Sequence, residues 1–149
     1  GTIVSDKTGD LKLVNQGGGT SGTFPPNLNV GKDEKVQGIF HTHPYDKSEG
    51  GATGVSLSGG DAAYMINGKQ NVIIAQSGNE QFMYMRTDKT PASVDFNGLN
   101  NGQNNRITEL TSKGMAFDKA SQVAARETAE KNGLAYYEGK GGVFNRKYP

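Results

Sequence analysis

The sequence predicts a single α+β domain, in which a mixed β-sheet is flanked by helices. At 149 residues the chain has the length of one ordinary domain. Short apolar runs with strand-like character dominate its first half, and segments with helical start and stop signals lie mainly in the second. No internal repeat or shift in composition marks a boundary. Residues 1–149 are therefore predicted to form one domain.

The first half of the sequence is predicted to be rich in strands. Residues Thr2–Ser5 and Leu11–Val14 flank a glycine-containing turn, which is typical of a β-hairpin. The apolar run Val36–Phe40 predicts the next strand. It leads directly into His41-Thr42-His43, and a proline then ends it. Residues 45–57 are polar and rich in glycine, so we expect a long loop there.

A short helix and two strands are predicted to follow this loop. Ser58 is the expected N-cap of the helix, and Asn67-Gly68 its expected end. Residues 71–76 and 81–86 are the two strands, and the second alternates Phe82, Tyr84 and Arg86 with methionines. This alternation predicts a half-buried strand.

The last third of the sequence is predicted to contain helices and a closing hairpin. Residues 91–102 are rich in Asn and Gly and are expected to be irregular, with a helix over 104–113. Asp118 is expected to cap a further helix over 118–131, which Asn132-Gly133 ends. Two strands, 134–138 and 143–146, are expected to form the hairpin.

The composition excludes several classes of function. The formal net charge of +1 gives no reason to expect nucleic acid or an anionic membrane as a partner. The chain has no cysteine, which excludes disulfides, thiolate zinc sites and thiol nucleophiles. No apolar run approaches the roughly 20 residues that a membrane helix needs, and no signal peptide opens the sequence.

The two histidines of the chain predict a metal site. His41 and His43 are two positions apart, so on a strand their side chains lie on the same face and can bind one ion. The alternative is that two exposed histidines happen to lie near a strand end. A catalytic zinc site typically takes three protein ligands, and without cysteine the third must be a carboxylate. Asp61, in the first turn of the predicted helix, is the best candidate, although it could simply stabilise the helix start.

These residues together form a recognisable pattern. His41-Thr42-His43-Pro44 followed by Ser58-Gly59-Gly60-Asp61 reads H-x-H-P and then S-x-x-D. This resembles the JAMM motif of the JAB1/MPN family of metallopeptidases. The resemblance implies a JAB1/MPN-like (cytidine-deaminase-like) architecture, with His41, His43 and Asp61 as Zn²⁺ ligands. It also implies that the hydroxyl of Ser58 stabilises the oxyanion, whereas helix capping is the alternative role of that serine.

The sequence departs from the family pattern in two respects. The gap between Pro44 and Ser58 is longer than usual, which implies an enlarged loop beside the site. The family also uses a glutamate as general base on an element that precedes the motif, and no glutamate occurs here before Glu34. Three positions are open for this base: upstream of Gly1, Glu34 in a predicted solvated turn, or Glu49 in the enlarged loop. A site without the base is the fourth possibility.

The resemblance implies a zinc-dependent hydrolase of amide or isopeptide bonds. It is nearest to the JAB-type domains at the C-terminal ends of secreted or contact-delivered bacterial toxins. We therefore expect residues 1–149 to be the C-terminal part of a larger, exported protein. Its expected partners are a protein, peptide or peptidoglycan-peptide substrate and an immunity protein. Two alternatives are a catalytically silent interaction module with the same fold and a metal-dependent phosphoesterase or nuclease.

Overall fold

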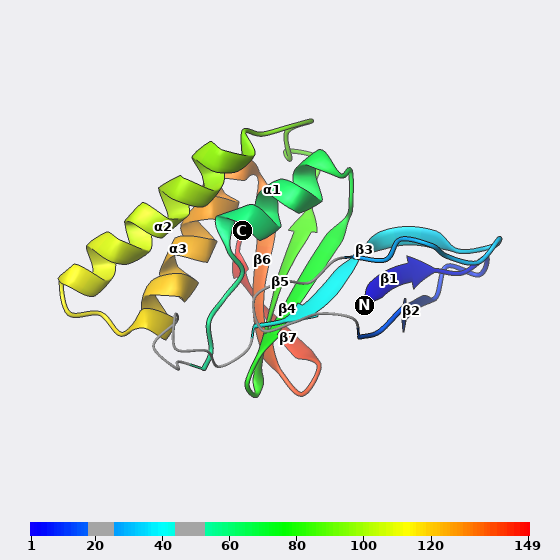
Figure 1. The fold of residues 1–149 in the computed structure, drawn as a ribbon, viewed down its shortest axis with the longest axis horizontal. Coiled ribbons are helices and arrows are strands. Elements are labelled where there is room, and N and C mark those ends of the chain that lie inside the picture. Colours follow the sequence, from blue (N-terminus) through cyan, green and yellow to red (C-terminus); the bar gives the residue numbers. More distant parts are fainter. Residues whose placement is uncertain (18–25, 44–52) are drawn as a thin grey trace.

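The computed structural model describes residues 1–17, 26–43 and 53–149. These residues form an α+β fold with one mixed seven-stranded sheet and three helices (Figure 1). The strands are β1 (Thr2–Ser5), β2 (Leu11–Val14), β3 (Lys35–Thr42), β4 (Val72–Ser77), β5 (Glu80–Arg86), β6 (Leu134–Lys140) and β7 (Val143–Tyr148). The helices are α1 (Gly59–Asn67), α2 (Phe96–Ser112) and α3 (Phe117–Asn132).

The sheet has the strand order β2-β1-β3-β4-β5-β6-β7. Only β3 and β4 pair in parallel, and α1 lies between them in the chain. All other neighbours are antiparallel. In a β-α-β unit the helix runs back along the sheet, so it begins near the carboxyl end of the first strand. The start of α1 therefore lies beside the end of β3.

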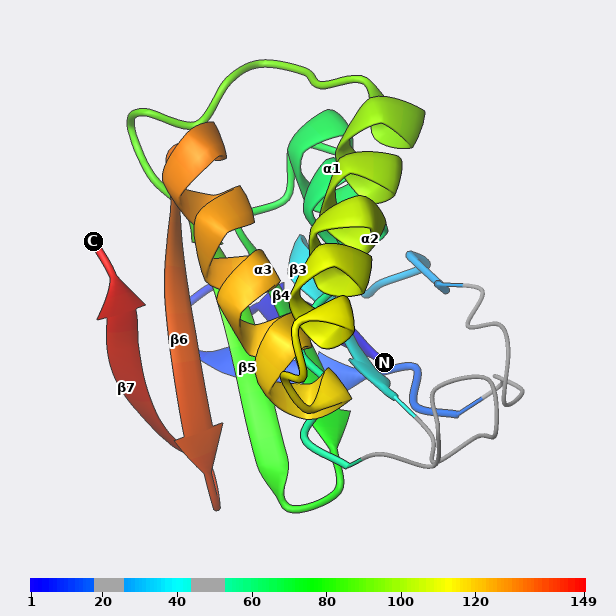
Figure 2. The ribbon, with the colours of Figure 1, turned by 90° about the vertical axis from the view of Figure 1, so that its left-hand side faces the viewer.

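The helices gather on one side of the sheet (Figure 2). Helices α1 and α3 contact strands, whereas α2 packs on these two helices. Inward-facing strand residues alternate with outward-facing ones, so that Phe82 and Tyr84 are buried while Met85 is exposed. The buried core between helices and sheet comprises Ile39, Leu57, Ala62, Met65, Ile66, Ile73, Ala75, Phe82, Tyr84, Ala125, Ala129, Leu134 and Tyr136.

Two glycines allow close packing around α1 and β3. A β-carbon on Gly38 would lie 1.6 Å from the carbonyl oxygen of Val72, so only glycine lets β4 start this close to β3. A β-carbon on Gly59 would lie 2.4 Å from the carbonyl oxygen of Leu99. The first residue of α1 is therefore held directly against α2.

Most predicted elements are confirmed. The predicted hairpin of β1 and β2 is present, Ser58 is the N-cap of α1, and Gly133 ends α3 in the left-handed conformation. The half-buried alternation predicted for residues 81–86 is also confirmed in β5. Among the described residues, no helix combines the length and apolar character needed to cross a membrane.

Two predictions about the later helices are wrong. Residues 96–102 are helical rather than irregular, because Asp95 caps α2 at the Gly98 amide and Leu99 packs against the core. These contacts outweigh the poor helix propensity of Asn and Gly. Asp118 does not cap α3: the N-cap is Ala116, which makes no side-chain capping bond. Asp118 instead lies in the first turn, where its negative charge interacts favourably with the positive end of the helix dipole.

Candidate metal centre

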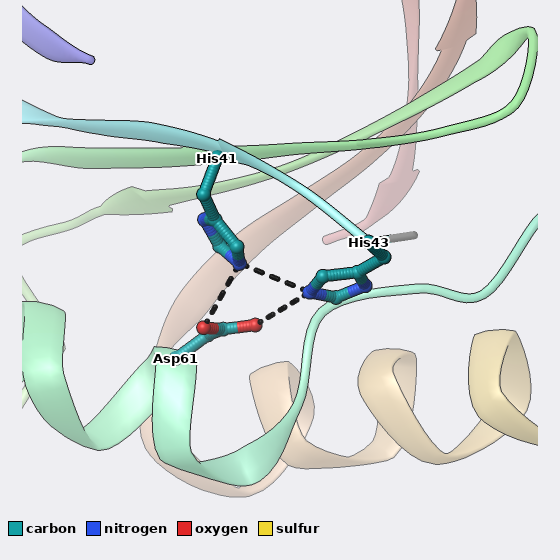
Figure 3. A group of neighbouring side chains, drawn as sticks. All are labelled: His41, His43 and Asp61. Atoms are coloured by element: carbon teal, nitrogen blue, oxygen red, sulfur yellow. Dashed lines mark hydrogen bonds and ion pairs between the residues drawn. The ribbon is translucent and has the colours of Figure 1, made fainter. Parts of the chain in front are cut away.

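The structure brings His41, His43 and Asp61 together at the end of β3 (Figure 3). His41 is the next-to-last residue of β3, and His43 lies just beyond the strand. The backbone amide of His43 still donates to the carbonyl of Gln76 at 2.8 Å, which extends the pairing with β4. Because the strand geometry continues, both rings project to the side of α1.

The capping of α1 places Asp61 opposite the two rings. The Ser58 hydroxyl accepts the Asp61 amide at 3.0 Å, and the Asp61 carboxylate accepts the Ser58 amide at 2.8 Å. This reciprocal pair is a capping box. It fixes the rotation of the Asp61 side chain, which then points to the histidines. Helix capping and metal binding are therefore compatible roles for this carboxylate.

The ligand groups of the three residues form a compact triangle, in which each histidine faces a different carboxylate oxygen of Asp61. The Nε2 atoms of His41 and His43 are 2.9 Å apart. Asp61 Oδ1 lies 3.2 Å from His41 Nε2, and Asp61 Oδ2 lies 3.5 Å from His43 Nε2. Ligand atoms that are each about 2.0–2.1 Å from one tetrahedral zinc ion lie about 3.3 Å from one another. The observed separations bracket this value, so the group is close enough to hold one divalent metal ion.

The hydrogen bond behind His43 favours the same conclusion. Its Nδ1 lies 3.1 Å from the carbonyl oxygen of Val55. A carbonyl oxygen only accepts, so Nδ1 must carry the hydrogen and the Nε2 of a neutral ring carries a lone pair. That lone pair is the one through which the ring would bind a metal ion.

The site is largely buried, and the carboxylate of Asp61 is ionised. The side chains of His41, His43 and Asp61 are 10, 15 and 17 % exposed. Burial raises the pKa of Asp61, but the adjacent His41 and His43 outweigh burial, so its pKa lies well below the ordinary value. The carboxylate is therefore ionised, as a metal ligand must be.

Ser58 and Ser56 have different surroundings. Ser58 lies at the start of α1 beside Asp61, as the S-x-x-D spacing predicts. The Ser56 hydroxyl is buried and shares a 2.8 Å hydrogen bond with the hydroxyl of Tyr136, which donates to Glu138 at 2.9 Å. Burial is the main cause that raises the pKa of Tyr136, so this phenol remains neutral. Of these two serines, Ser58 is the one that lies beside Asp61, whereas Ser56 is engaged by Tyr136.

One of the predicted positions for the general base, Glu34, is excluded by the structure. Glu34 precedes β3, seven residues before His41, which corresponds to about 23 Å along an extended strand. Its carboxylate pairs with Lys12 at 2.6 Å and accepts the Gly31 amide at 2.8 Å. Glu34 therefore does not reach the metal centre. Glu49 lies outside the described residues.

Residues 54–57 were not predicted to take part in the site. This segment carries Val55, whose carbonyl accepts the hydrogen bond from His43, and it is fixed by side chains from the three elements β4, α2 and α3. Its backbone groups form hydrogen bonds with the side chains of Ser77, Ser121, Gln103 and Gln122. No local pattern in the sequence marks these contacts, because they join residues that are 22 to 68 positions apart.

Comparison with known proteins adds no relative to this description. No family model matches the chain, and neither the curated proteins nor the solved structures include a significant match.

Proposed function

We propose that this chain is a zinc-dependent hydrolase that cleaves an amide or isopeptide bond, with a JAMM-like site in a JAB1/MPN-like fold. The observation that carries the proposal is the triangle of His41 Nε2, His43 Nε2 and the Asp61 carboxylate. Two neutral imidazoles and one carboxylate are a ligand set of catalytic zinc, with a fourth position left for water. The parallel β3-α1-β4 unit supports it, since such units bind ligands at the carboxyl ends of strands.

Each residue has a defined task in the proposed reaction. Bound zinc supplies Lewis-acid activation of a water molecule and of the scissile carbonyl. His41, His43 and Asp61 hold the ion, and the capping box keeps the carboxylate in place. One lone pair of the Ser58 hydroxyl accepts the Asp61 amide, which leaves the O–H to donate to an oxyanion.

The sheet register supports a position for the general base. The Gly1 amino group donates to the Phe40 carbonyl at 2.7 Å, and the Phe40 amide donates to the Gly1 carbonyl at 2.8 Å. If the antiparallel pairing continues, a residue directly before Gly1 lies opposite His41. Cross-strand partners share a face of the sheet, so a glutamate there would lie beside the metal centre. We therefore favour the upstream position for the base.

Substitution of Ser58 by alanine is expected to lower kcat about 10²-fold or more, because one oxyanion donor is lost. The chain should also lose about 1 kcal/mol of stability with the N-cap. Asp95→Ala is a matched control, since Asp95 caps α2 by accepting the Gly98 amide at 3.0 Å. Steady-state kinetics and urea unfolding should show similar stability losses but a kcat loss only for Ser58→Ala. Equal kcat values would contradict the assigned role.

The proposed function is tested by comparing substrate classes. The zinc-loaded chain, carrying a glutamate directly before Gly1, is assayed on peptide, isopeptide, peptidoglycan-peptide and phosphodiester substrates. We expect cleavage of at least one amide-type bond and none of phosphodiesters. Cleavage of phosphodiesters alone would establish the phosphoesterase alternative. Zinc binding without any hydrolysis would favour the silent interaction module. Export within a larger bacterial toxin and an immunity partner stay predictions.

A further inference from the structure

A single peptide group holds the ring of His43 from behind. The peptide that joins Val55 to Ser56 accepts the Nδ1–H of His43 through its carbonyl oxygen at 3.1 Å. The N–H of the same peptide group donates to the Ser121 hydroxyl at 3.0 Å. A group tied at both ends cannot rotate without losing a buried hydrogen bond. Its position therefore controls where the His43 ring points.

Ser121 extends this chain of hydrogen bonds into α3. Its hydroxyl accepts from Ser56 and donates to the Asp118 carbonyl at 2.7 Å, so both of its hydrogen-bonding functions are used. From His43 to Asp118 every bond runs in the same donor-to-acceptor direction. Aligned bonds of this kind polarise one another. The hydroxyl therefore makes the Val55 carbonyl a stronger acceptor for His43.

We propose that Ser121 is a positioning residue for the metal centre. By fixing the Val55–Ser56 peptide group, it keeps His43 in the tautomer and orientation in which Nε2 faces His41 and Asp61. This inference rests on the metal site of the proposed function but not on hydrolysis. Outer partners of this kind orient metal-binding histidines and raise the basicity of the ring.

Ser77 provides a matched control within the same segment. Its hydroxyl accepts the Val55 amide at 3.0 Å, and Ser77 and Ser121 are each 1 % exposed. The Val55 amide, however, belongs to the preceding peptide group, whose carbonyl accepts the Gln122 side chain at 2.8 Å. Ser77→Ala and Ser121→Ala thus remove the same kind of buried bond at neighbouring amides. Only Ser121→Ala releases the peptide group that holds the ring.

The test is zinc affinity, measured by competition with a chromophoric chelator for the parent chain, Ser121→Ala, Ser121→Thr and Ser77→Ala. We expect Ser121→Ala to weaken zinc binding about 10- to 100-fold, the usual effect of losing an outer partner. Ser77→Ala should weaken zinc binding by less than about threefold. Ser121→Thr keeps the hydroxyl and should restore affinity to within about threefold. With cobalt as probe, only Ser121→Ala should shift the visible absorption bands.

Three outcomes separate this inference from the proposed function. Equal zinc affinities of Ser121→Ala and Ser77→Ala would overturn the inference, as would a threonine variant as weak as the alanine variant. A parent chain that binds neither zinc nor cobalt would overturn both proposals. A clear affinity difference in a chain that hydrolyses none of the substrates would leave the inference standing while the proposed reaction fails.

Discussion

Replacing His41 and His43 together by alanine is expected to reduce bound zinc from about one equivalent to near zero. The two rings supply two of the three ligand atoms in the triangle, and one carboxylate alone does not hold zinc well. Because losing an outer partner alone costs 10- to 100-fold in affinity, losing two ligands should cost more than about 10³-fold. Elemental analysis after dialysis, followed by zinc titration, measures the change.

The control for this experiment is Glu34→Gln. Glu34 is a carboxylate near the other end of β3, paired with Lys12 rather than with the metal centre. Made in the chain that carries a glutamate directly before Gly1, this variant should keep about one equivalent of zinc and full activity. Circular dichroism should show that both variants are folded. A parent chain without zinc, or a double variant that retains it, would contradict the metal site and the proposed function with it.

A glutamate placed directly before Gly1 is expected to raise kcat about 10²- to 10⁴-fold over glutamine at the same position. The range is the usual contribution of a general acid–base group. The register of β1 on β3 puts this residue opposite His41, in a pair whose side chains approach closely. Zinc content should be the same in both chains, because neither residue is a ligand. Kinetics on the best amide-type substrate measures the difference.

The strand geometry provides the control for the base. A glutamate one residue further upstream would point to the opposite face of the sheet, because successive side chains alternate. That chain should be as inactive as the glutamine variant while binding zinc equally well. Equal activity of the glutamate and glutamine chains would exclude a base at this position. Activity that appears only with the shifted glutamate would show that the pairing of β1 and β3 does not continue as inferred.

Local signals account for the elements and residues that were predicted correctly. The glycine-containing turn between β1 and β2, the serine N-cap of α1 and Gly133 at the end of α3 act over a few residues, so their sequence pattern is enough. The shared orientation of His41 and His43 was also predictable from the sequence, since residues two apart on a strand have their side chains on one face. The zinc identity, the reaction and the family resemblance stay proposals.

The errors arose where tertiary contacts outweigh local preference. The start of α2 is rich in Asn and Gly, yet it is helical because Leu99 packs on the core and Asn100 accepts the Gly60 amide at 3.0 Å. α3 begins at Phe117, one residue before the predicted cap. Helix propensities differ by less than about 1 kcal/mol per residue. Packing of one buried side chain is enough to reverse such a preference.

The sequence by itself determined the composition limits, most of the elements and the identity of the three candidate ligands. Only the tertiary structure decided that these ligands meet. The parallel pairing of β3 and β4 brings the start of α1 back to the end of β3, and the capping box then aims Asp61 at the histidines. Ser121 could not be identified from sequence, because its link to His43 passes through backbone groups 65 residues away. Nearly every residue has the same backbone donor and acceptor, so a hydrogen bond to the backbone leaves no pattern in the sequence. Only the three-dimensional structure reveals it.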